Sequence, residues 1–257
     1  MCKIIAISNQ KGGVGKTTTS INLAAALANF SRRVLLVDLD PQSDSSRGLN
    51  IDVSLLNESI FEVLLNKASI KKVIKKSSIP HFDIAPSKFP SYSIEVLGEK
   101  FDEPYALLRK ALNPILDNYD YIIIDCPPSL GFLTLNALNA ANSVLIPVQC
   151  EYFAMEAVSQ MLAAIARIQS STNPNLTIEG FLLTMYDSKS NYSTEVTMQI
   201  RSLFKENTFL TQVPRNISIP ESNSKGMPVT VYRKSSSGAL AYFSLAREVI
   251  DKEDKNN

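Results

Sequence analysis

Histidine and cysteine are scarce in this chain of 257 residues. His81 is its one histidine, so the sequence offers neither a histidine zinc cluster nor a histidine-based catalytic triad. The three cysteines, Cys2, Cys126 and Cys150, follow no metal-binding or disulfide spacing. This usage is typical of a reduced, cytosolic protein, and we expect Cys126 to be a small buried thiol.

The chain also lacks a strong excess of either charge and a long apolar run. Its 26 basic and 25 acidic residues give a formal net charge of +1, so nucleic acid binding would need a local basic patch. No run of about 18 apolar residues predicts a membrane span, and we find no secretory signal. The polar segment 247–257 does not resemble a membrane-surface helix. We therefore expect no membrane contact and a cytoplasmic location.

Hydrophobic residues make up 45% of the chain, which is typical of a globular protein with a sizeable core. Short apolar runs alternate with segments of helical periodicity, and runs such as Val34–Val37 suit a parallel sheet covered on both faces. This alternation predicts a doubly wound α/β fold, a mostly parallel sheet with helices on both faces, in a single domain over residues 1–257. We interpret Lys71–Ser78 as a surface excursion. The expected strands are Ile4–Ser8, Val34–Asp38, Phe82–Ala85, Tyr121–Asp125, Val144–Val148, Ile178–Thr184 and Phe209–Val213, and the expected helices are Thr17–Asn29, Tyr105–Asn118, Glu156–Gln169, Thr194–Phe204 and Ala239–Asp251.

A glycine-rich segment follows the first expected strand. It reads Lys11-Gly12-Gly13-Val14-Gly15-Lys16-Thr17-Thr18. Glycines let backbone N–H groups surround phosphate oxygens, and the next helix presents its positive N-terminus to the anion. We expect Lys16 to reach the β- and γ-phosphates of a nucleotide and the Thr17 hydroxyl to bind Mg²⁺. Because Gln10 replaces the first glycine of the strict pattern, a glycine-rich turn without a ligand is the alternative; the flanking strand and helix favour the phosphate loop.

The same loop carries a second lysine. Lys11 lies five residues before Lys16. One ATP does not need two lysines from one loop, so we interpret Lys11 as a charge that is supplied to another site, such as a partner's ATP.

Two later strands end in aspartate. Asp38-Leu39-Asp40 completes Val34–Val37, and Asp125 completes Tyr121–Ile124. A carboxylate at such a strand end holds Mg²⁺ in P-loop NTPases, directly or through water. We expect Asp38 and Asp40 to point to opposite sides of the strand, one toward Mg²⁺ and the other toward the attacking water. Taken alone, these residues also fit an ordinary polar transition from strand to loop.

Together the motifs resemble the deviant Walker-A ATPases of the ParA/MinD superfamily. The loop Lys11–Thr18 and the segments Val37–Gln42 and Ile124–Ser129 carry this resemblance. Further segments are similar to the small ParA/Soj chromosome-partitioning ATPases, and the likeness runs from about residue 3 to about residue 250. These segments are Pro147–Tyr152, Leu183–Asp187 and Val213–Asn216.

The resemblance implies ATP hydrolysis in a homodimer that encloses two nucleotides. Lys11 would reach the partner's ATP, as an arginine finger does, and Lys16 and Asp40 would complete the catalytic set. The ligands of Mg²⁺ would be Thr17, Asp38 and Asp125. Residues near the adenine would be Met185, Pro214 and Asn216.

The resemblance also implies a nucleoid-associated protein that segregates or positions chromosome or plasmid DNA. The ATP dimer would bind double-stranded DNA without sequence preference, and a ParB-type protein would stimulate hydrolysis. The expected DNA contacts are Lys189, Arg215, Lys225 and Arg233, which without the resemblance fit an ordinary solvated surface. Ser218 stands where a basic DNA contact is common, which predicts weaker DNA binding, and Asp44 adds a negative charge near the phosphates.

Three alternatives stay open. One is a positioning ATPase for a protein cargo, either MinD-like or cluster-positioning. Another is an iron–sulfur reductase or a ligase-like synthetase on the same scaffold, which the cysteine positions disfavour. The third is a DNA-binding repressor; because the first expected strand begins at Ile4, we expect no helix-turn-helix before it.

Overall fold

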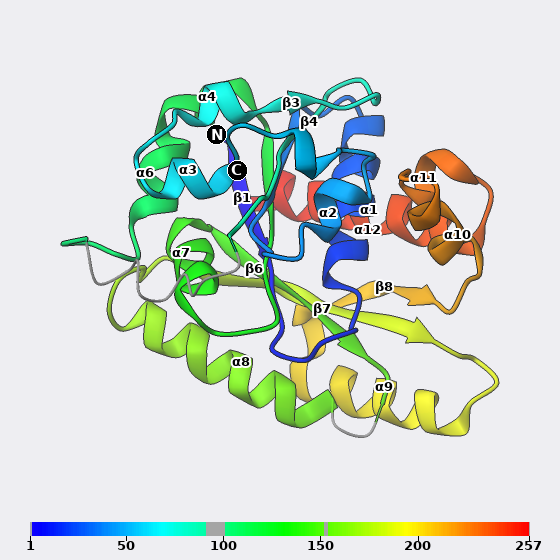
Figure 1. Ribbon diagram of the computed structural model, residues 1–257. Helices are drawn as coiled ribbons and strands as arrows, with labels where there is room; N and C mark the ends of the chain where they lie inside the picture. The colour runs from blue at the N-terminus through cyan, green and yellow to red at the C-terminus, as the bar shows by residue number, and fades with distance from the viewer. Residues whose placement is uncertain (1, 91–100, 152–153, 257) are drawn as a thin grey trace.

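An eight-stranded sheet runs through the centre of the computed structural model, which describes residues 2–90, 101–151 and 154–256 (Figure 1). The strand order is β3-β4-β2-β5-β1-β6-β7-β8, and every neighbouring pair is parallel except β3 and β4. The sheet confirms the expected fold class. The strands are β1 (Lys3–Ile7), β2 (Val34–Asp38), β3 (Lys75–Lys76), β4 (Phe82–Ala85), β5 (Tyr121–Asp125), β6 (Ser143–Gln149), β7 (Thr177–Tyr186) and β8 (Thr208–Pro214).

Helices cover both faces of this sheet. On β1, Ile4 and Ala6 face one hydrophobic cluster while Ile5 and Ile7 face the other, because successive side chains of a strand alternate. Burial on both faces explains why the strands are apolar throughout. The first cluster is covered by α3 (Ile60–Leu64), α4 (Ile70–Val73), α6 (Leu107–Leu112), α7 (Phe132–Ala140), α8 (Ala154–Gln169) and α9 (Asn191–Phe204), and the second by α1 (Lys16–Asn29), α11 (Val229–Tyr232) and α12 (Ser237–Asn256).

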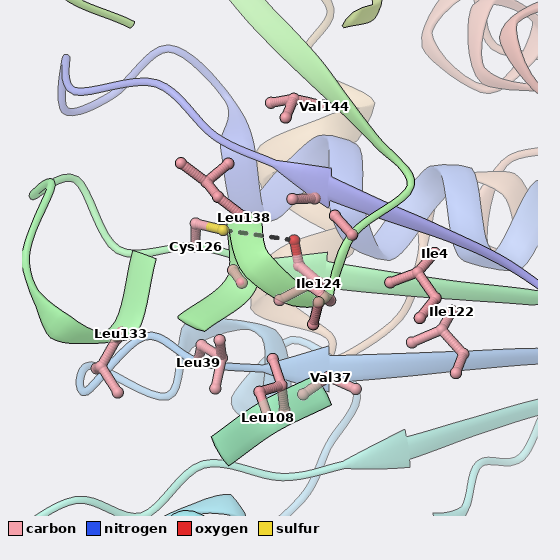
Figure 2. Packing of buried hydrophobic residues seen from close by; sticks show 14 of the residues in the cluster. Ile4, Val37, Leu39, Leu108, Ile122, Ile124, Cys126, Leu133, Leu138 and Val144 are labelled. Atoms are coloured by element: carbon pink, nitrogen blue, oxygen red, sulfur yellow. Dashed lines mark hydrogen bonds between the residues drawn. The ribbon is translucent and has the colours of Figure 1, made fainter. Parts of the chain in front are cut away.

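Cys126 lies within the first cluster (Figure 2). Its side chain is fully buried, and its thiol donates to the carbonyl oxygen of Ile124 at 3.9 Å. Burial raises the pKa of this thiol well above its ordinary value. The expectation of a small buried thiol is confirmed. Separately, none of the helices within the described residues combines the length and the apolar character needed to cross a membrane.

Some expected elements differ from the observed ones. The expected helix Tyr105–Asn118 is wrong in its second half, because α6 ends at Leu112 and a 3₁₀ helix follows over Asn113–Asn118. Pro114 has no N–H to continue the α-helical hydrogen bonds. The surface excursion Lys71–Ser78 contains the end of α4 and the edge strand β3.

The register of the central strands brings their carboxyl ends to one edge of the sheet. Asp125 of β5 pairs with Ile7 of β1 on one side and with Asp38 of β2 on the other. Ligands of open α/β sheets bind beyond this edge. The glycine-rich loop and both strand-end aspartates therefore belong to a single site.

The close approach of β7 to Phe209 gives a test of the core. A Cβ added to Gly180 would lie 2.6 Å from the Cε2 atom of Phe209, a buried ring that also contacts the Lys252 ammonium. We expect Gly180→Ala to lower the free energy of unfolding by about 1–3 kcal/mol, measured by urea denaturation. Gly12→Ala is the control, because no atom lies within 4 Å of its added Cβ. Equal stability of the two variants would contradict the predicted clash.

Candidate nucleotide and magnesium site

The glycine-rich loop is held in shape by its own glycines and by neighbouring strands. Gly13 and Gly15 have φ angles of 75° and 89°, which glycine adopts without strain, and α1 begins directly afterwards. The carbonyl oxygen of Val14 accepts the Thr184 hydroxyl of β7 at 2.9 Å. Asn9 accepts the N–H of Lys11 at 3.1 Å and donates to Pro147 of β6 at 2.7 Å. The loop is thus fixed to β6 and β7.

Lys16 turns back onto the loop. Its Nζ donates to the carbonyl oxygen of Lys11 at 3.1 Å, and the residue is only 7% exposed. Burial lowers the pKa of Lys16, an effect that the nearby Asp125 partly opposes. A phosphate oxygen is a stronger acceptor for this ammonium than a neutral carbonyl, so the arrangement favours an anion inside the loop.

Asp38 and Asp125 are two fully buried carboxyl groups at neighbouring strand ends. Burial raises the pKa of Asp38 to about 8, with Asp125 as the second cause. Burial also raises the pKa of Asp125 to about 6, against the hydroxyl groups that donate to it. The donors are Ser20 at 2.9 Å and Ser45 at 2.7 Å for Asp125, and the hydroxyl and N–H of Ser46 at 2.6 and 2.8 Å for Asp38.

This set of oxygen atoms fits Mg²⁺. Two adjacent carboxylates repel each other, and a divalent cation relieves that repulsion. The Thr17 hydroxyl lies close enough to Asp125 to lower its pKa. Among the described residues no group of three or more His, Cys, Asp or Glu side chains forms a metal cage. Magnesium suits that finding, because it usually takes one or two carboxylates and completes its shell with water and phosphate oxygens.

Asp40 follows the end of β2 at Asp38, so the alternation of a strand does not set the direction of its side chain. The expectation that the two carboxylates point to opposite sides rested on a wrong premise, because residues two apart in a strand share a face. Asp40 helps to raise the pKa of Asp125, so it lies near that carboxyl group. Its N–H donates to Asp38 Oδ1 at 3.1 Å, and its Oδ1 accepts the N–H of Gln42 at 2.9 Å.

A pocket of about 520 Å³ adjoins the loop, a size that is ordinary for a small-molecule site. It brings together the expected residues Gly15, Thr18, Met185, Pro214 and Asn216. Their contact with a nucleotide stays a prediction. The sequence analysis missed Ile217, Ile219, Pro220 and Asn223 from α10 (Ser218–Ser224) and the segment before it, and Tyr242 from α12. No motif marks these residues, because they reach the pocket only through the fold of the C-terminal segment.

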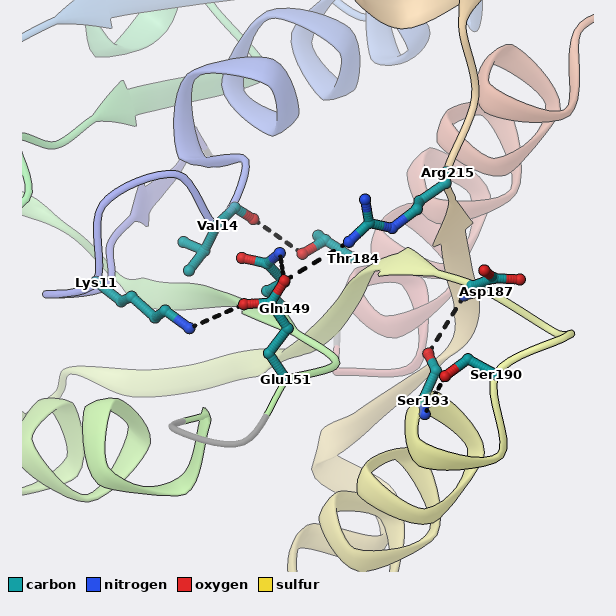
Figure 3. Close-up of polar contacts among 9 residues, drawn as sticks. All are labelled: Lys11, Val14, Gln149, Glu151, Thr184, Asp187, Ser190, Ser193 and Arg215. Carbon is teal, nitrogen blue, oxygen red and sulfur yellow. Dashed lines mark hydrogen bonds and ion pairs between the residues drawn. The ribbon is translucent and has the colours of Figure 1, made fainter.

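The Lys11 side chain leaves its own loop and approaches Glu151, which follows β6 (Figure 3). The Lys11 Nζ lies 3.5 Å from Glu151 Oε2, and an Arg215 guanidinium nitrogen lies 3.6 Å from Oε1. Gln149 also donates to Glu151 Oε1. Sequence reasoning missed this carboxylate as a site residue. The structure therefore separates the two lysines: Lys16 stays within the loop, and Lys11 is directed away from it.

The expected DNA contacts differ in their surroundings. Arg215 pairs with Glu151, while Lys189 and Lys225 are exposed. Ser218 is only 2% exposed, so its hydroxyl is not part of the exposed surface, and the weaker DNA binding expected from it stays a prediction. The Arg233 guanidinium donates to the Ser218 hydroxyl at 3.2 Å and lies 4.0 Å from a Glu221 oxygen. Arg233 thus supplies a cation beside position 218.

A phosphate loop after β1, strand-end aspartates on β2 and β5 and a second lysine in the loop define a deviant Walker-A P-loop NTPase. A protein-family model for the AAA domain matches residues 2–178. The sporulation initiation inhibitor protein Soj of Bacillus subtilis is 44% identical over 249 residues, covering 97% of this chain and 98% of that protein. The chain belongs to the ParA/Soj family of chromosome-partitioning ATPases.

Two further proteins support the assignment. The chromosome partitioning protein ParA of Myxococcus xanthus is 46% identical over 251 residues, covering 98% of this chain and 89% of that protein. Among solved structures, cobyrinic acid a,c-diamide synthase from Mycobacterium smegmatis with bound ADP and magnesium is 34% identical, with a TM-score of 0.88. The alignment covers 100% of this chain and 97% of that one.

The buried carboxyl pair generates a test of stability against pH. Because the native state binds more protons than the unfolded state between about pH 4 and pH 8, the free energy of unfolding should fall as pH rises through this range. We expect Asp125→Asn, without nucleotide and with a chelator, to be more stable by about 1–2 kcal/mol at pH 7.5 and to show a shallower decline. Urea denaturation at several pH values measures both.

The amide introduced by this substitution would leave no polar atom unpaired, since the hydroxyl groups of Ser20 and Ser45 can donate or accept. Asp254→Asn, an exposed site on α12, is the control and should match the wild type. A variant at position 125 that is less stable than the wild type would contradict the predicted cost of the paired charges.

Proposed function

We propose that this protein is an ATP-dependent dimerisation switch that binds double-stranded DNA non-specifically and hydrolyses ATP to segregate chromosome or plasmid DNA. The observation that carries the proposal is the division between the two lysines of one loop. Lys16 is retained inside the loop, whereas Lys11 turns outward to an ion pair that is partly exposed. The names of the Soj and ParA relatives support the same function.

In this proposal the loop binds the phosphates of ATP, and Lys16 exchanges its carbonyl partner for a phosphate oxygen. Thr17, Asp38 and Asp125 hold Mg²⁺, which neutralises phosphate charge when bound. Asp40 orients the attacking water, and its backbone N–H bond to Asp38 fixes the turn that carries it. Met185, Pro214 and Asn216 line the base pocket; the Asn216 amide is held by the Ser237 hydroxyl at 2.7 Å.

Dimerisation would connect ATP to DNA binding. A protomer with a net charge of +1 has little attraction for DNA as a whole, whereas a dimer joins two sets of contacts and gains from bivalency. Lys189, Arg215, Lys225 and Arg233 are the proposed contacts in each protomer. A ParB-type partner would stimulate hydrolysis and release the nucleoid-bound dimer.

The synthase name of the Mycobacterium smegmatis structure raises a different function, which the thiols disfavour. A synthase that uses a cysteine nucleophile needs a reactive thiol with a lowered pKa. Burial raises the pKa of Cys2 to about 12 and also raises the pKa of Cys126 and Cys150. A positioning ATPase for a protein cargo remains the alternative, since it would use the same ATP switch.

Complementation between two inactive variants tests whether Lys11 acts on the partner's ATP. We expect Lys11→Ala and Asp40→Ala each to abolish phosphate release, and an equal mixture to regain up to about half of the activity per heterodimer. In the heterodimer, the site that keeps Asp40 receives Lys11 from the other chain. The measurement is phosphate release at fixed total protein, with heterodimers verified by differential tagging.

Lys16→Ala mixed with Asp40→Ala is the control, because Lys16 serves its own loop and no complete site can form. Calorimetry should show that Lys16→Ala alone has lost ATP binding. If heterodimers form and the Lys11→Ala mixture stays inactive, Lys11 acts within its own protomer and the proposed switch is wrong.

The cation beside position 218 generates a test of the DNA surface. We expect Arg233→Gln to weaken ATP-dependent binding to random duplexes several-fold and to lower the salt slope by about one, because one phosphate contact is lost. Fluorescence polarisation across a salt series, with and without ATP, measures both quantities. The control is Arg167→Gln, which also removes one positive charge, from an exposed position on α8. If Arg233→Gln leaves the salt slope of DNA binding unchanged, Arg233 does not contact a DNA phosphate.

A further inference from the structure

A second cavity, of about 410 Å³, lies on the side of the sheet that α1, α11 and α12 cover. It shares no lining residue with the nucleotide pocket. Its walls come from the end of α1, from α11 and the segment that follows it, from α12, and from the turn between β3 and β4. The three helices pack against one another, and a cavity of this size is ordinary for a small-molecule site.

The body of this cavity is apolar. Phe243 of α12 is one wall, and its ring is held edge-on by Phe30, with the two ring centroids 6.4 Å apart. The other apolar lining residues are Ala25 and Ala28 of α1, Ile79 and Pro80 of the β3–β4 turn, and Val231 of α11. Such a surface stabilises a ligand that has apolar groups to remove from water.

The rest of the lining is polar and unpaired. Thr230 is only 2% exposed, and its hydroxyl oxygen has no hydrogen-bond partner. Buried hydroxyl groups are usually hydrogen-bonded, and threonine in a helix has two accessible rotamers, so a rotation can bring this hydroxyl to a ligand. The other polar lining side chains also make no hydrogen bond or ion pair with a described residue; they are Asn29, Ser31, Ser78, His81 and Lys234.

The charge of the lining selects an anion. The lining contains no aspartate or glutamate, and the exposed Lys234 has no carboxylate within 4.0 Å among the described residues. Carbonyl oxygens at the end of α1 do not offer a cation site, because they already accept the N–H groups of Phe30, Ser31 and Arg32. An ammonium group on a ligand would therefore find repulsion from Lys234 and no partner.

We propose that this cavity binds a small monocarboxylate with an apolar chain. The chain packs against Ala25, Ala28 and Phe243, and the carboxylate accepts from the Lys234 ammonium and the Thr230 hydroxyl. Inorganic phosphate has no apolar part to cover the body of the cavity. A neutral apolar molecule leaves Lys234 without a partner. The carboxylate with an apolar chain is the class of ligand that satisfies both parts of the lining.

Binding at this cavity needs neither ATP, a dimer nor DNA. Arg233, a proposed DNA contact, precedes Lys234 in the chain but does not line the cavity. Its guanidinium donates to the Ser218 hydroxyl and lies 4.0 Å from a Glu221 oxygen. The proposal therefore goes beyond the proposed function, and experiments without nucleotide and DNA test it independently of the ATP switch.

Calorimetry on the nucleotide-free protein tests the apolar part with butanoate, hexanoate and octanoate. We expect the affinity to rise about threefold for each added methylene, because each one removes more apolar surface from water. The charged part is tested with Lys234→Gln, which should weaken octanoate binding about fivefold and leave octan-1-ol unaffected. Lys234→Glu should reverse the preference, so that octylammonium binds more tightly than octanoate.

The buried hydroxyl is tested with Thr230→Val, which keeps the shape of the side chain. This variant should bind octanoate several-fold more weakly, whereas its urea midpoint should not fall, since the lost hydroxyl is unpaired in the free protein. A purely structural role for Thr230 would leave octanoate affinity unchanged. The control is Lys67→Gln, an exposed lysine outside the cavity, which should match the wild type in both measurements.

Several outcomes would overturn the proposal. One is no binding of octanoate by the wild type at millimolar concentration, and another is an affinity that does not depend on chain length. Equal octanoate affinities of Lys234→Gln and Lys67→Gln would exclude Lys234 as the partner of the carboxylate. Tighter binding of inorganic phosphate than of octanoate, lost in Lys234→Gln, would assign this lysine to a phosphate group instead.

Discussion

The carboxyl groups of Asp38 and Asp125 lie side by side at the ends of two parallel strands in register, and neither is exposed. Neighbouring strands are about 4.8 Å apart, so two negative charges here repel strongly. Hydroxyl groups offset part of this cost. Ser20 donates from α1, and Ser45 and Ser46 donate from α2 (Asp44–Arg47). The carboxyl pair thus attaches the first helix and the β2–α2 turn to the sheet, and this attachment orients the phosphate loop and Asp40.

Such a pair is costly for the protein alone and useful to a cation-dependent site. The raised pKa values of Asp38 and Asp125 mean that ionisation of the native state is unfavourable until a positive charge arrives. Lys16, whose own pKa is lowered by burial, is a neighbouring positive charge, and its ammonium binds the loop carbonyl. Stability is sacrificed at functional sites in this way because the same groups gain more when the ligand binds.

The sequence predicted this edge of the sheet well, because burial on both faces makes β1, β2 and β5 continuous apolar runs, and β2 and β5 end in aspartate. It did not predict α7, whose side chains are buried nearly all round and so show no amphipathic stripe. The burial of Ser218 and the ion pair between Lys11 and Glu151 also escaped prediction. Both depend on contacts between segments that are far apart in the sequence, and no local sequence pattern predicts such contacts.

A net charge of +1 conceals a marked separation of charge. Near the nucleotide site, Lys11 and Arg215 share Glu151, and Arg233 lies beside Glu221, so carboxylates set the positions of these cations. Among the five exposed lysines of residues 63–82, Lys76 alone has an ion pair with a described residue, and their charge extends into solvent. At physiological salt the Debye length is about 8 Å, far less than the roughly 30 Å between the two margins of the sheet. Each margin of the sheet therefore presents a separate local field to an anion, and the chain's total charge does not determine what either margin attracts.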